Sequence, residues 1–476
     1  MLNHWNNKEC IKANQQKLST IFFSLFSSWL LAFLFQGQVL YELTNKYNID
    51  PYILILGVMG VHFLGLFLGG LFVKNIENAR DIIVFSMAIS IIGSIPFFFI
   101  PSILWNFAII TISFFAGTCV ASWGYYFKKF TYSNERIKTA ANVLIFSNIL
   151  MIFINMVSIH ISPYTGLAIS IFMVVVALII TLKLPVNMVG DMEWSYLENR
   201  KVIRITKPLG ILCLFIVVIT VNSGLMYQVI NPEFQHHQWL VSWYWALPYV
   251  AMLYVIKKLP PKVNRSYMLY VAIGMIGFAF LFFMIFDRSV LSYLIINTLM
   301  LGACGIYDLF WWSILGELLD YSSNPGKVFG IGLSSNVLGV FLGTIFGKIM
   351  NVKDVPNQNA SILALGVAFL TFIMLPVLHN QLLIFLKNHI FLRTLIEMPP
   401  SEQQSTIDKF GISYKLTERE KEISSLLLRG RTYKMIANEL YLSENTVKTH
   451  IKNIYSKFNV SSKTELINFL MEKENS

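Results

Sequence analysis

Charged side chains are scarce in this sequence of 476 residues, where Asp, Glu, Lys and Arg together make up only 13%. Soluble domains carry about a quarter charged residues, so this shortage excludes an ordinary soluble protein. Hydrophobic residues account for 55%, and Phe alone occurs 38 times. The composition therefore indicates an integral membrane protein.

Cysteine is also rare, and no arrangement of catalytic residues is visible. The four cysteines, Cys10, Cys119, Cys213 and Cys304, are isolated from one another, which excludes a disulfide framework and the ligand spacing of a zinc site. Paired carboxylates, a nucleophile triad and a Gly-rich phosphate loop are all missing. We therefore expect no enzymatic activity, no cofactor and no metal site.

Long apolar runs, in contrast, are abundant. Twelve of them are long enough to cross the roughly 30 Å hydrocarbon layer of a bilayer, and a polar loop separates them into six and six. We therefore predict an all-α protein with a polytopic bundle of about twelve transmembrane helices. The predicted divisions are an N-terminal segment (1–19), the membrane domain (20–386) with halves 20–182 and 208–386 around the central loop (183–207), a linker (387–412) and a C-terminal head (413–476).

The distribution of positive charge predicts the orientation in the membrane. The loops on the side of the N-terminus hold 19 Lys and Arg residues, whereas those on the opposite side hold 4. Positive residues mark the cytoplasmic face. We therefore expect a multi-pass protein of the bacterial cytoplasmic (inner) membrane with both termini in the cytoplasm.

The layout of the bundle resembles that of the major facilitator superfamily of secondary transporters. The resemblance rests on the six-plus-six arrangement and on short basic loops after the second and eighth runs. The stretch GGLFVKNIENAR after the second run keeps Gly69, Gly70 and Arg80 of the family's cytoplasmic motif but lacks its Asp. The resemblance implies two six-helix halves with a substrate site between them.

Polar residues within the apolar runs predict where such a site lies. Asp308 lies deep in the tenth run, beside Trp311, and an ionisable residue at membrane depth is costly unless it serves a function. With Asn222 and Asn297 these residues form a candidate ligand cavity between the halves. Further candidates for the same cavity are Gln36, His62 and Gln228. The alternative is that these residues only satisfy one another between helices.

Glycines recur at every fourth position in two of the runs. Gly339, Gly343 and Gly347 do so in the eleventh run, and Gly65 and Gly69 in the second. This spacing allows helix backbones to approach closely. It predicts close packing within the bundle, with a dimer interface as the alternative.

The head begins beyond a linker that Pro399 and Pro400 interrupt. Thr417 and Glu420 have the spacing of a capping box, which opens a first helix. A second helix starts at Thr432, and after the short turn YLS a third helix begins with Ser443 as its N-cap. The third helix buries an apolar stripe and presents Lys and Thr residues on its other face. Two helices joined by a tight turn, the second of them basic, are typical of a helix-turn-helix.

The head resembles the LuxR/FixJ-type DNA-binding domain over residues 413–476 without gaps. The matching stretches are LTEREKEI, Gly430, Ile436–Ala437, LYLSENTVKTHIKNI and KFNV. The resemblance implies a four-helix domain in which Lys448, Thr449 and Lys452 face the DNA groove. It also implies further DNA-binding residues at Thr432, Ser443, Asn445, Thr446 and Lys457, and dimerisation through the last helix at Thr464, Ile467 and Asn468.

Taken together, the sequence predicts a membrane-embedded one-component transcriptional regulator. Its expected partners are promoter or operator DNA, the lipid bilayer and a second copy of the chain through the head. A signal, either a small molecule or a protein, is expected to act on the transporter-like bundle. The alternative is a secondary transporter of a small solute with an attached regulatory DNA-binding tail.

Overall fold

The computed structural model describes residues 2–35, 37–132, 135–184, 205–259, 265–350, 358–397, 414–428, 433–460, 466 and 469–470. All regular elements in these ranges are helices, as the apolar periodicity predicts. The chain divides into two compact units, with a boundary between Leu375 and Pro376. We describe the bundle and the head separately.

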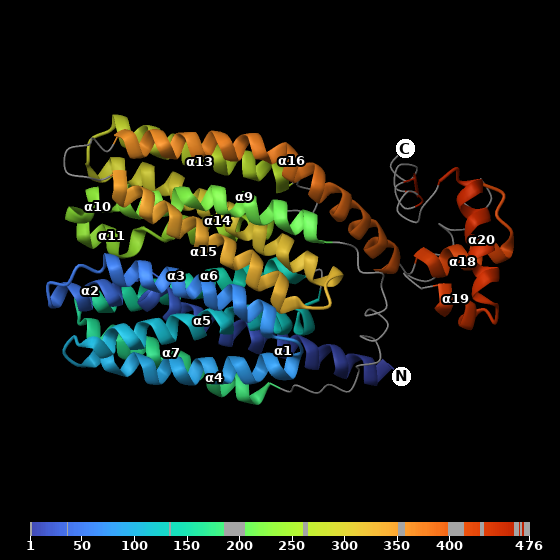
Figure 1. Cartoon of the computed structure of the whole chain (residues 1–476), viewed down its shortest axis with the longest axis horizontal. Coiled ribbons are helices and arrows are strands. Elements are labelled where there is room, and N and C mark those ends of the chain that lie inside the picture. The colour runs from blue at the N-terminus through green and yellow to red at the C-terminus, as the bar shows by residue number, and fades with distance from the viewer. Residues whose placement is uncertain are drawn as a thin grey trace. The chain divides into compact units, whose positions relative to one another are not determined.

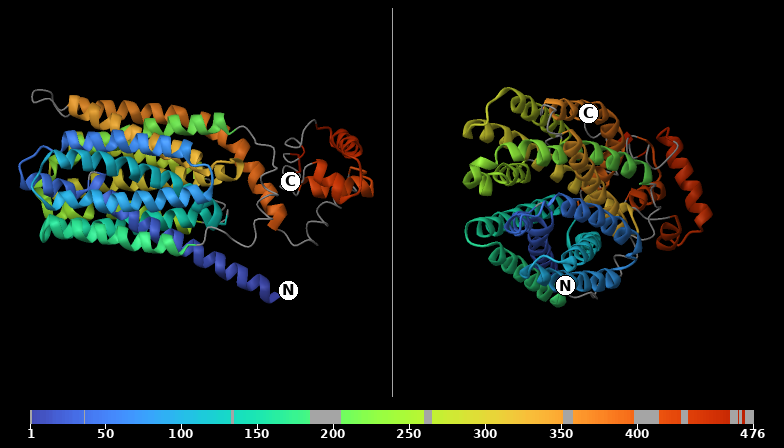
Figure 2. Two further views of the ribbon diagram at one scale, coloured as in Figure 1. Left: turned by 60° about the horizontal axis from the view of Figure 1, so that its bottom comes forward. Right: turned by 60° about the vertical axis from the view of Figure 1, so that its left-hand side comes forward.

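The first half of the bundle contains the helices coloured blue to teal in Figures 1 and 2. Their bounds are α1 Leu2–Trp29, η1 Leu30–Leu34 (a π-helical turn), α2 Gln38–Lys46, α3 Tyr52–Phe72, α4 Ile76–Ser94, η2 Ile95–Phe98 (a 3₁₀ turn), α5 Ile103–Phe130, α6 Arg136–His160 and α7 Pro163–Lys183.

The second half contains the helices coloured green to orange, which gather in a separate group beside the first half (Figures 1 and 2). Their bounds are α9 Thr206–Leu225, η4 Met226–Ile230 (a π-helical turn), α10 Asn231–Glu233, η5 Gln235–His237 (a 3₁₀ turn), α11 Gln238–Tyr244, α12 Leu247–Lys258, α13 Arg265–Ile285, α14 Val290–Leu318, η6 Leu319–Tyr321 (a 3₁₀ turn), α15 Pro325–Met350 and α16 Gln358–Glu397.

Twelve segments of the described chain are helical, long and apolar enough to cross a membrane. This confirms the number of spans predicted from the sequence. Three cysteines within them, Cys119, Cys213 and Cys304, are free thiols, as expected.

Three of the spans are interrupted, which the sequence analysis did not predict. The first span passes from α1 into the π-helical turn η1 and resumes as α2 only at Gln38. The seventh span contains the π-helical turn η4 at its end. The eighth span stops with α11 at Tyr244 and restarts with α12, whose first turn contains Pro248. Since proline lacks the N–H that a continuing helix needs, it suits a helix start at this point.

The glycine repeats pack helices within the bundle, as the preferred interpretation predicts. A Cβ atom on Gly339 or Gly343 of α15 would collide with backbone carbonyls of α9, and one on Gly65 would collide with α5. On another side of α15, Gly330 lies directly against Gly70 of α3. Small residues therefore let α15 contact helices of both halves.

Polar contacts also join the two halves of the bundle. The Arg136 guanidinium of α6 donates a hydrogen bond to the Gly316 carbonyl of α14 at 2.6 Å. The Tyr125 hydroxyl of α5 donates a hydrogen bond at 3.2 Å to the side chain of Asn324, the residue just before α15. Because Arg136 is only 3% exposed, its guanidinium is a buried structural element of this junction.

The last long helix, α16, continues to Glu397 through an internal proline at position 376. The first residues of the predicted linker (387–412) are therefore helical. The remainder of that linker, from Met398 onward, and most of the central loop (183–207) lie outside the described residues.

The head contains three described helices, α18 Glu418–Leu428, α19 Tyr433–Glu439 and α20 Glu444–Lys457. The predicted capping box is present: the Glu420 N–H donates to the Thr417 hydroxyl at 3.3 Å, and the Thr417 N–H donates to the Glu420 carboxylate at 2.8 Å. The predicted N-cap of α20 is also present, since the Thr446 N–H donates to the Ser443 hydroxyl at 3.1 Å. Each cap satisfies an N–H that the helix itself leaves unpaired.

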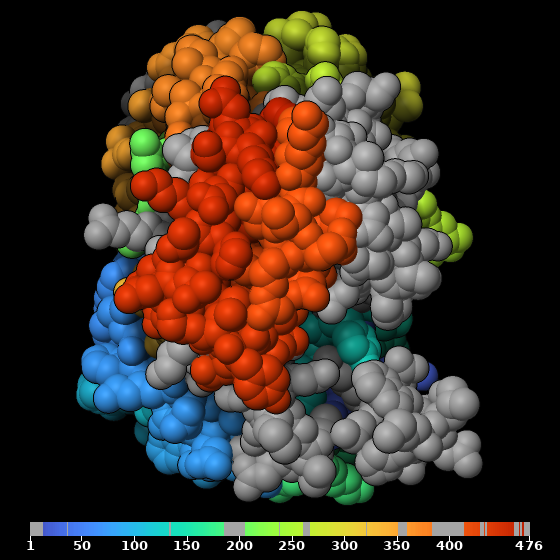
Figure 3. Space-filling model, turned by 90° about the vertical axis from the view of Figure 1, so that its right-hand side faces the viewer, coloured from blue at the N-terminus to red at the C-terminus, as the bar shows by residue number. Residues whose placement is uncertain are grey.

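The three helices enclose an apolar core of their own, and their described residues, red in Figure 3, pack as one continuous body. The buried residues of this core include Ile423, Leu426, Leu427, Ile436, Ala437, Val447, Ile451, Ile454 and Phe458, and Leu440 packs against it partly buried. Leu466 and Leu470, from the last predicted helix, join the same core. The head therefore has the hydrophobic core of a separate small domain.

Candidate functional sites: a DNA-binding helix and a buried cavity

Helices α19 and α20 form the helix-turn-helix, and the turn between them is tightly hydrogen-bonded. The Leu442 N–H donates to the Ala437 carbonyl at 2.8 Å, and Tyr441 adopts a left-handed conformation with φ of 53°. The Arg419 guanidinium of α18 donates to the Leu440 carbonyl at 2.7 Å. This contact from α18 fixes the turn, and the sequence analysis did not predict it.

The face of α20 opposite the core carries the residues predicted to read bases. Lys448, Thr449 and Lys452 are all exposed. The Lys448 ammonium lies 3.1 Å from the Glu444 carboxylate one turn earlier, with both side chains about half exposed. Lys452 has no ion pair with any described residue. An exposed basic helix of this kind has the chemistry needed to contact DNA in the major groove.

The first turn of α20 gathers three of the further DNA-binding residues that the resemblance implies. Ser443, Asn445 and Thr446 are exposed, and the hydroxyls of Ser443 and Thr446 lie 2.7 Å apart. A helix N-terminus favours an anion through its unpaired N–H groups and its dipole. The arrangement is therefore suited to a phosphate of the DNA backbone.

Lys457 has a different environment from the other lysines of α20. Its ammonium donates to the Glu420 carboxylate at 2.6 Å and to the Lys415 carbonyl at 2.9 Å. Burial alone would raise the pKa of Glu420, but hydrogen bonds from Lys457 and Thr417 outweigh it and hold the pKa below its usual value. Lys457 therefore connects α20 to the start of α18, and its predicted role in DNA binding stays a prediction.

The remaining predicted residues of the head, Thr432, Thr464, Ile467 and Asn468, lie outside the described residues. Their roles in DNA binding and dimerisation stay predictions.

The bundle encloses a cavity of about 230 Å³ between its two halves. All three interrupted spans contribute to its wall: Leu31 comes from the turn η1, Tyr227 from the turn η4, and Trp245 from the break between α11 and α12. Discontinuous helices and π-helical turns often surround ligand sites in membrane and soluble proteins. All three interruptions therefore lie at the wall of this cavity, where a ligand site is expected.

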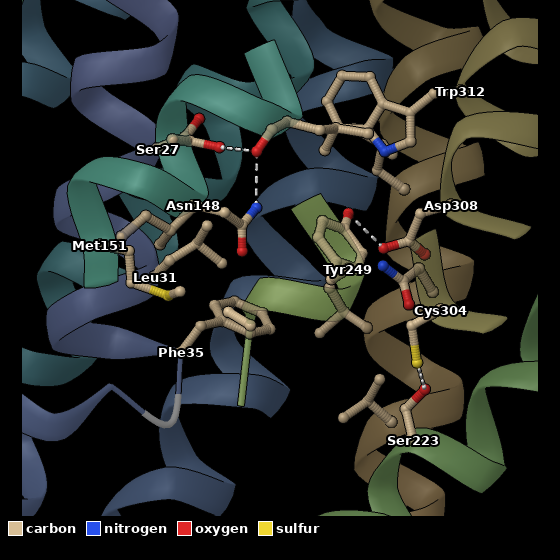
Figure 4. Close-up of a pocket in the computed structure, with 18 of the residues that line it drawn as sticks. Ser27, Leu31, Phe35, Asn148, Met151, Ser223, Tyr249, Cys304, Asp308 and Trp312 are labelled. Carbon is tan, nitrogen blue, oxygen red and sulfur yellow. Dashed lines mark hydrogen bonds between the residues drawn. The ribbon is translucent and has the colours of Figure 1, made fainter. Parts of the chain in front are cut away.

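Asp308 lies in the wall of this cavity, on α14 (Figure 4). Its Oδ2 atom accepts a hydrogen bond from the Tyr249 hydroxyl of α12 at 2.8 Å. No other described residue donates to its carboxylate. Ser27, Leu31 and Asn148, from α1, η1 and α6, lie on the facing side in the same view.

The other three residues predicted for the cavity do not line it. Asn297 donates a hydrogen bond to the Trp245 carbonyl at 3.2 Å, so it satisfies a helix break as the alternative interpretation proposed. Asn222 and Trp311 are buried elsewhere, and the polar atoms of their side chains have no hydrogen-bond partner among the described residues. Distances along an apolar sequence do not reveal which side of a helix faces the cavity.

Among the further candidates, His62 does line the cavity, and its Nδ1 atom lies 3.1 Å from the Ser113 carbonyl oxygen. Gln228 lies outside its wall, packed near Gly347. Gln36 is outside the described residues. The role of the cavity as a ligand site stays a prediction.

Fold and sites together define a multi-pass membrane protein with a DNA-binding helix-turn-helix domain. Residues 414–470 match the family model for bacterial regulatory proteins of the luxR family. The spore germination protein GerE of Bacillus subtilis is 42% identical over 52 residues, which are 11% of this chain and 70% of GerE. Through its head, the chain belongs to the LuxR family of bacterial regulatory proteins.

A second relative also matches only a short part of the chain. The transcriptional regulatory protein LiaR of Bacillus subtilis is 52% identical over 50 residues, which cover 10% of this chain and 24% of LiaR. The chain thus spans about a quarter of the length of this relative.

The bundle is similar in fold to a solved transporter structure. The human organic anion transporter MFSD10 (TETRAN) superposes with a TM-score of 0.59 at 13% sequence identity, over 76% of this chain and 98% of that chain. At this identity the similarity concerns the fold alone. The membrane domain therefore has a fold similar to that of this transporter chain, which agrees with the transporter-like layout predicted from the sequence.

Proposed function

We propose that this protein is a membrane-embedded one-component transcriptional regulator of the bacterial cytoplasmic membrane. The observation that carries the proposal is the presence, in one chain, of an intact LuxR-type helix-turn-helix with an exposed basic α20 and of a bundle with a cavity at its interrupted helices. The head supplies the output, and the bundle receives the signal. No enzymatic reaction is part of the proposal.

The asymmetric distribution of Lys and Arg supports a cytoplasmic head. The loops assigned to the cytoplasm hold 19 of these residues and the opposite loops 4, as the positive-inside rule requires. An even number of spans supports a head on the same side as the N-terminus. DNA is accessible to it there.

Lys448, Thr449 and Lys452 read bases in this proposal, and Ser443, Asn445 and Thr446 hold phosphates. The head carries 11 Lys and Arg and 8 Asp and Glu over residues 411–476. This small positive excess gives a single head modest, salt-sensitive affinity. Two heads on half-sites about one helical turn apart bind more tightly, so pairing of heads, with Thr464, Ile467 and Asn468 in contact, is the step that a signal controls.

The test is DNase footprinting with the full chain in nanodiscs, on fragments upstream of its own gene and of the neighbouring genes. We expect a protected site that disappears in the double variant Lys448→Ala/Lys452→Ala. Lys327→Ala, which removes a similar exposed charge from the bundle, is the matched control and keeps the footprint. Absence of any footprint for the unmodified chain contradicts the DNA-binding output.

A second experiment tests the bundle as the receiver of the signal. Residues 1–386 are replaced by an unrelated membrane anchor, and expression from the target promoter is measured in cells under changing growth conditions. We expect expression to become constant. If it still responds as with the full chain, the bundle is an anchor and the sensing role is wrong.

The fold of the bundle favours one alternative function, a secondary transporter whose tail regulates expression. MFSD10 is named as an organic anion transporter, but no Lys or Arg among the described residues lines the cavity here, so the described wall offers an anionic solute no cationic partner. Accumulation of a solute in vesicles that contain this protein, lost in Asp308→Asn, would favour transport.

A further inference from the structure

The charge of the cavity is unbalanced. Asp308 is the one carboxylate among the lining residues, and neither Lys nor Arg is among them. One carboxylate oxygen accepts from Tyr249, while the other has no donor among the described residues. A carboxylate in apolar surroundings is stabilised either by taking up a proton or by pairing with a positive charge. The described wall of the cavity supplies a hydroxyl but no fixed cation.

Most polar groups near the cavity are already engaged with protein partners. The Asn148 amide N–H donates to the Leu144 carbonyl at 2.8 Å, and the His62 ring pairs with the Ser113 carbonyl. The Tyr307 hydroxyl lies 2.6 Å from the Ser223 hydroxyl. Few groups remain to recognise a ligand with many hydroxyls, such as a sugar.

Apart from Ser27, Ser147 and Asn336, the rest of the wall is apolar and rich in aromatic rings, including Phe23, Phe35, Tyr227 and Trp312. Aromatic faces attract cations and also pack against flat apolar groups. In Figure 4 Phe35 and Leu31 lie on the opposite side of the cavity from Asp308. The cavity thus offers an anionic end and an apolar end to one molecule.

These features exclude other ligand classes. A divalent cation needs several oxygen ligands, and the described residues contain no group of three His, Cys, Asp or Glu that would hold a metal. A volume of about 230 Å³ lies below the roughly 300–1,000 Å³ of pockets for drug-sized ligands. One small molecule with a cationic head and an apolar body fits these limits.

We propose that the cavity binds a protonated primary amine with an aromatic or aliphatic body, whose ammonium pairs with Asp308 beside Tyr249. The inference that this amine is the signal rests on the proposed regulatory function. Binding itself depends only on the bundle, so the two are tested separately.

The experiment uses the full chain in detergent and three probes with the same phenyl ring, which are phenethylamine, 2-phenylethanol and 3-phenylpropionate. Binding is measured by calorimetry and by the fluorescence of the tryptophans in the cavity wall, Trp245 and Trp312. We expect the amine to bind about tenfold or more tightly than the neutral and anionic probes, because only its charge complements the carboxylate.

Two variants separate the charge from the fold. Asp308→Asn keeps the shape of the side chain, and we expect it to lose about tenfold or more in amine affinity. Asp81→Asn removes an exposed carboxylate from α4 and leaves the affinity unchanged. A monodisperse elution profile checks that each variant is folded. If Asp308→Asn does not fold, the comparison of the three probes on the unmodified chain tests whether the cavity prefers the amine.

Equal binding of the amine and the alcohol overturns the proposal, because Asp308 would then be no counter-ion. Unchanged amine affinity in folded Asp308→Asn overturns it as well. If the amine binds as expected but does not alter the DNA footprint of the full chain, the ligand class stands and the proposed sensing function fails.

Discussion

The two lysines Lys452 and Lys457 of α20 differ in role although they lie on one helix, and substituting each by Ala makes the difference measurable. Lys452 is exposed and has no ion-pair partner among the described residues. Lys457 lies against Glu420, whose side chain is 4% exposed, and is itself 33% exposed. Lys452→Ala therefore removes a charge available to DNA, whereas Lys457→Ala removes one that the head uses internally.

The magnitudes follow from these environments. Lys452→Ala is expected to lose one DNA contact, which costs about 1–3 kcal/mol for a base contact and so lowers affinity roughly 5- to 150-fold. It also reduces the slope of log affinity against log salt by about 1. In Lys457→Ala, Glu420 keeps its hydrogen bond from the Thr417 N–H. We therefore expect a loss of only about 1–2 kcal/mol in the stability of the head.

The assay measures both quantities on the full chain in nanodiscs. Fluorescence anisotropy with duplex DNA at several salt concentrations gives the affinity and its slope. Hydrogen exchange of peptides from α18 and α20 gives the free energy of opening of the head. If Lys457→Ala lowers the salt slope as much as Lys452→Ala and leaves the opening free energy unchanged, Lys457 contacts DNA and our reasoning about its ion pair is refuted.

Three further predictions concern other parts of the chain. Gly343→Leu forces α15 away from α9 and lowers the thermal unfolding temperature. The control Gly366→Leu leaves this temperature unchanged, because a Cβ atom at Gly366 meets open space. Equal effects of the two substitutions would contradict the packing described. Because the pKa of Glu420 is depressed in the folded head, its contribution to stability is fully present above the ordinary pKa near 4.5 and is lost as the pH falls through the lower folded value. The denaturant midpoint of the head should therefore fall in acid, and less so in Glu420→Gln. Arg136→Met removes a buried link between the halves and should lower the free energy of unfolding of the solubilised protein by about 1–3 kcal/mol, measured by thermal unfolding. The control Lys138→Met, on the exposed face, should lower it by less than about 1 kcal/mol. A larger effect of Lys138→Met than of Arg136→Met would count against the link.

Local patterns in the sequence predict the membrane spans and the helices of the head, but not the interruptions within the spans. Apolar runs of membrane length predict the twelve spans, because lipid leaves few alternatives to a helix. The spacing of Thr417 and Glu420 predicts the capping box, since both partners lie within one helical turn. The glycine repeats predict close packing because glycines four residues apart lie on the same face of one helix.

Contacts between distant residues explain what the sequence did not predict. Lys457 pairs with Glu420 across the head, and Asp308 pairs with Tyr249 from another helix, and neither pairing has a signature in the spacing of residues. The sequence did not predict that Asn222 and Trp311 are buried outside the cavity, because a helix that is apolar all round does not show which of its faces lines the interior. The π-helical turn η1 likewise has no local signal, since Leu30–Leu34 is as apolar as its neighbours.

The covalent continuity of the bundle and the head has a consequence for gene regulation. A soluble regulator searches the chromosome by three-dimensional diffusion and by sliding along DNA. A head that is continuous with twelve membrane helices instead diffuses in two dimensions for as long as the chain is intact. Its operator must therefore come to the membrane, and the position of the target gene relative to the cell envelope becomes part of the regulatory mechanism.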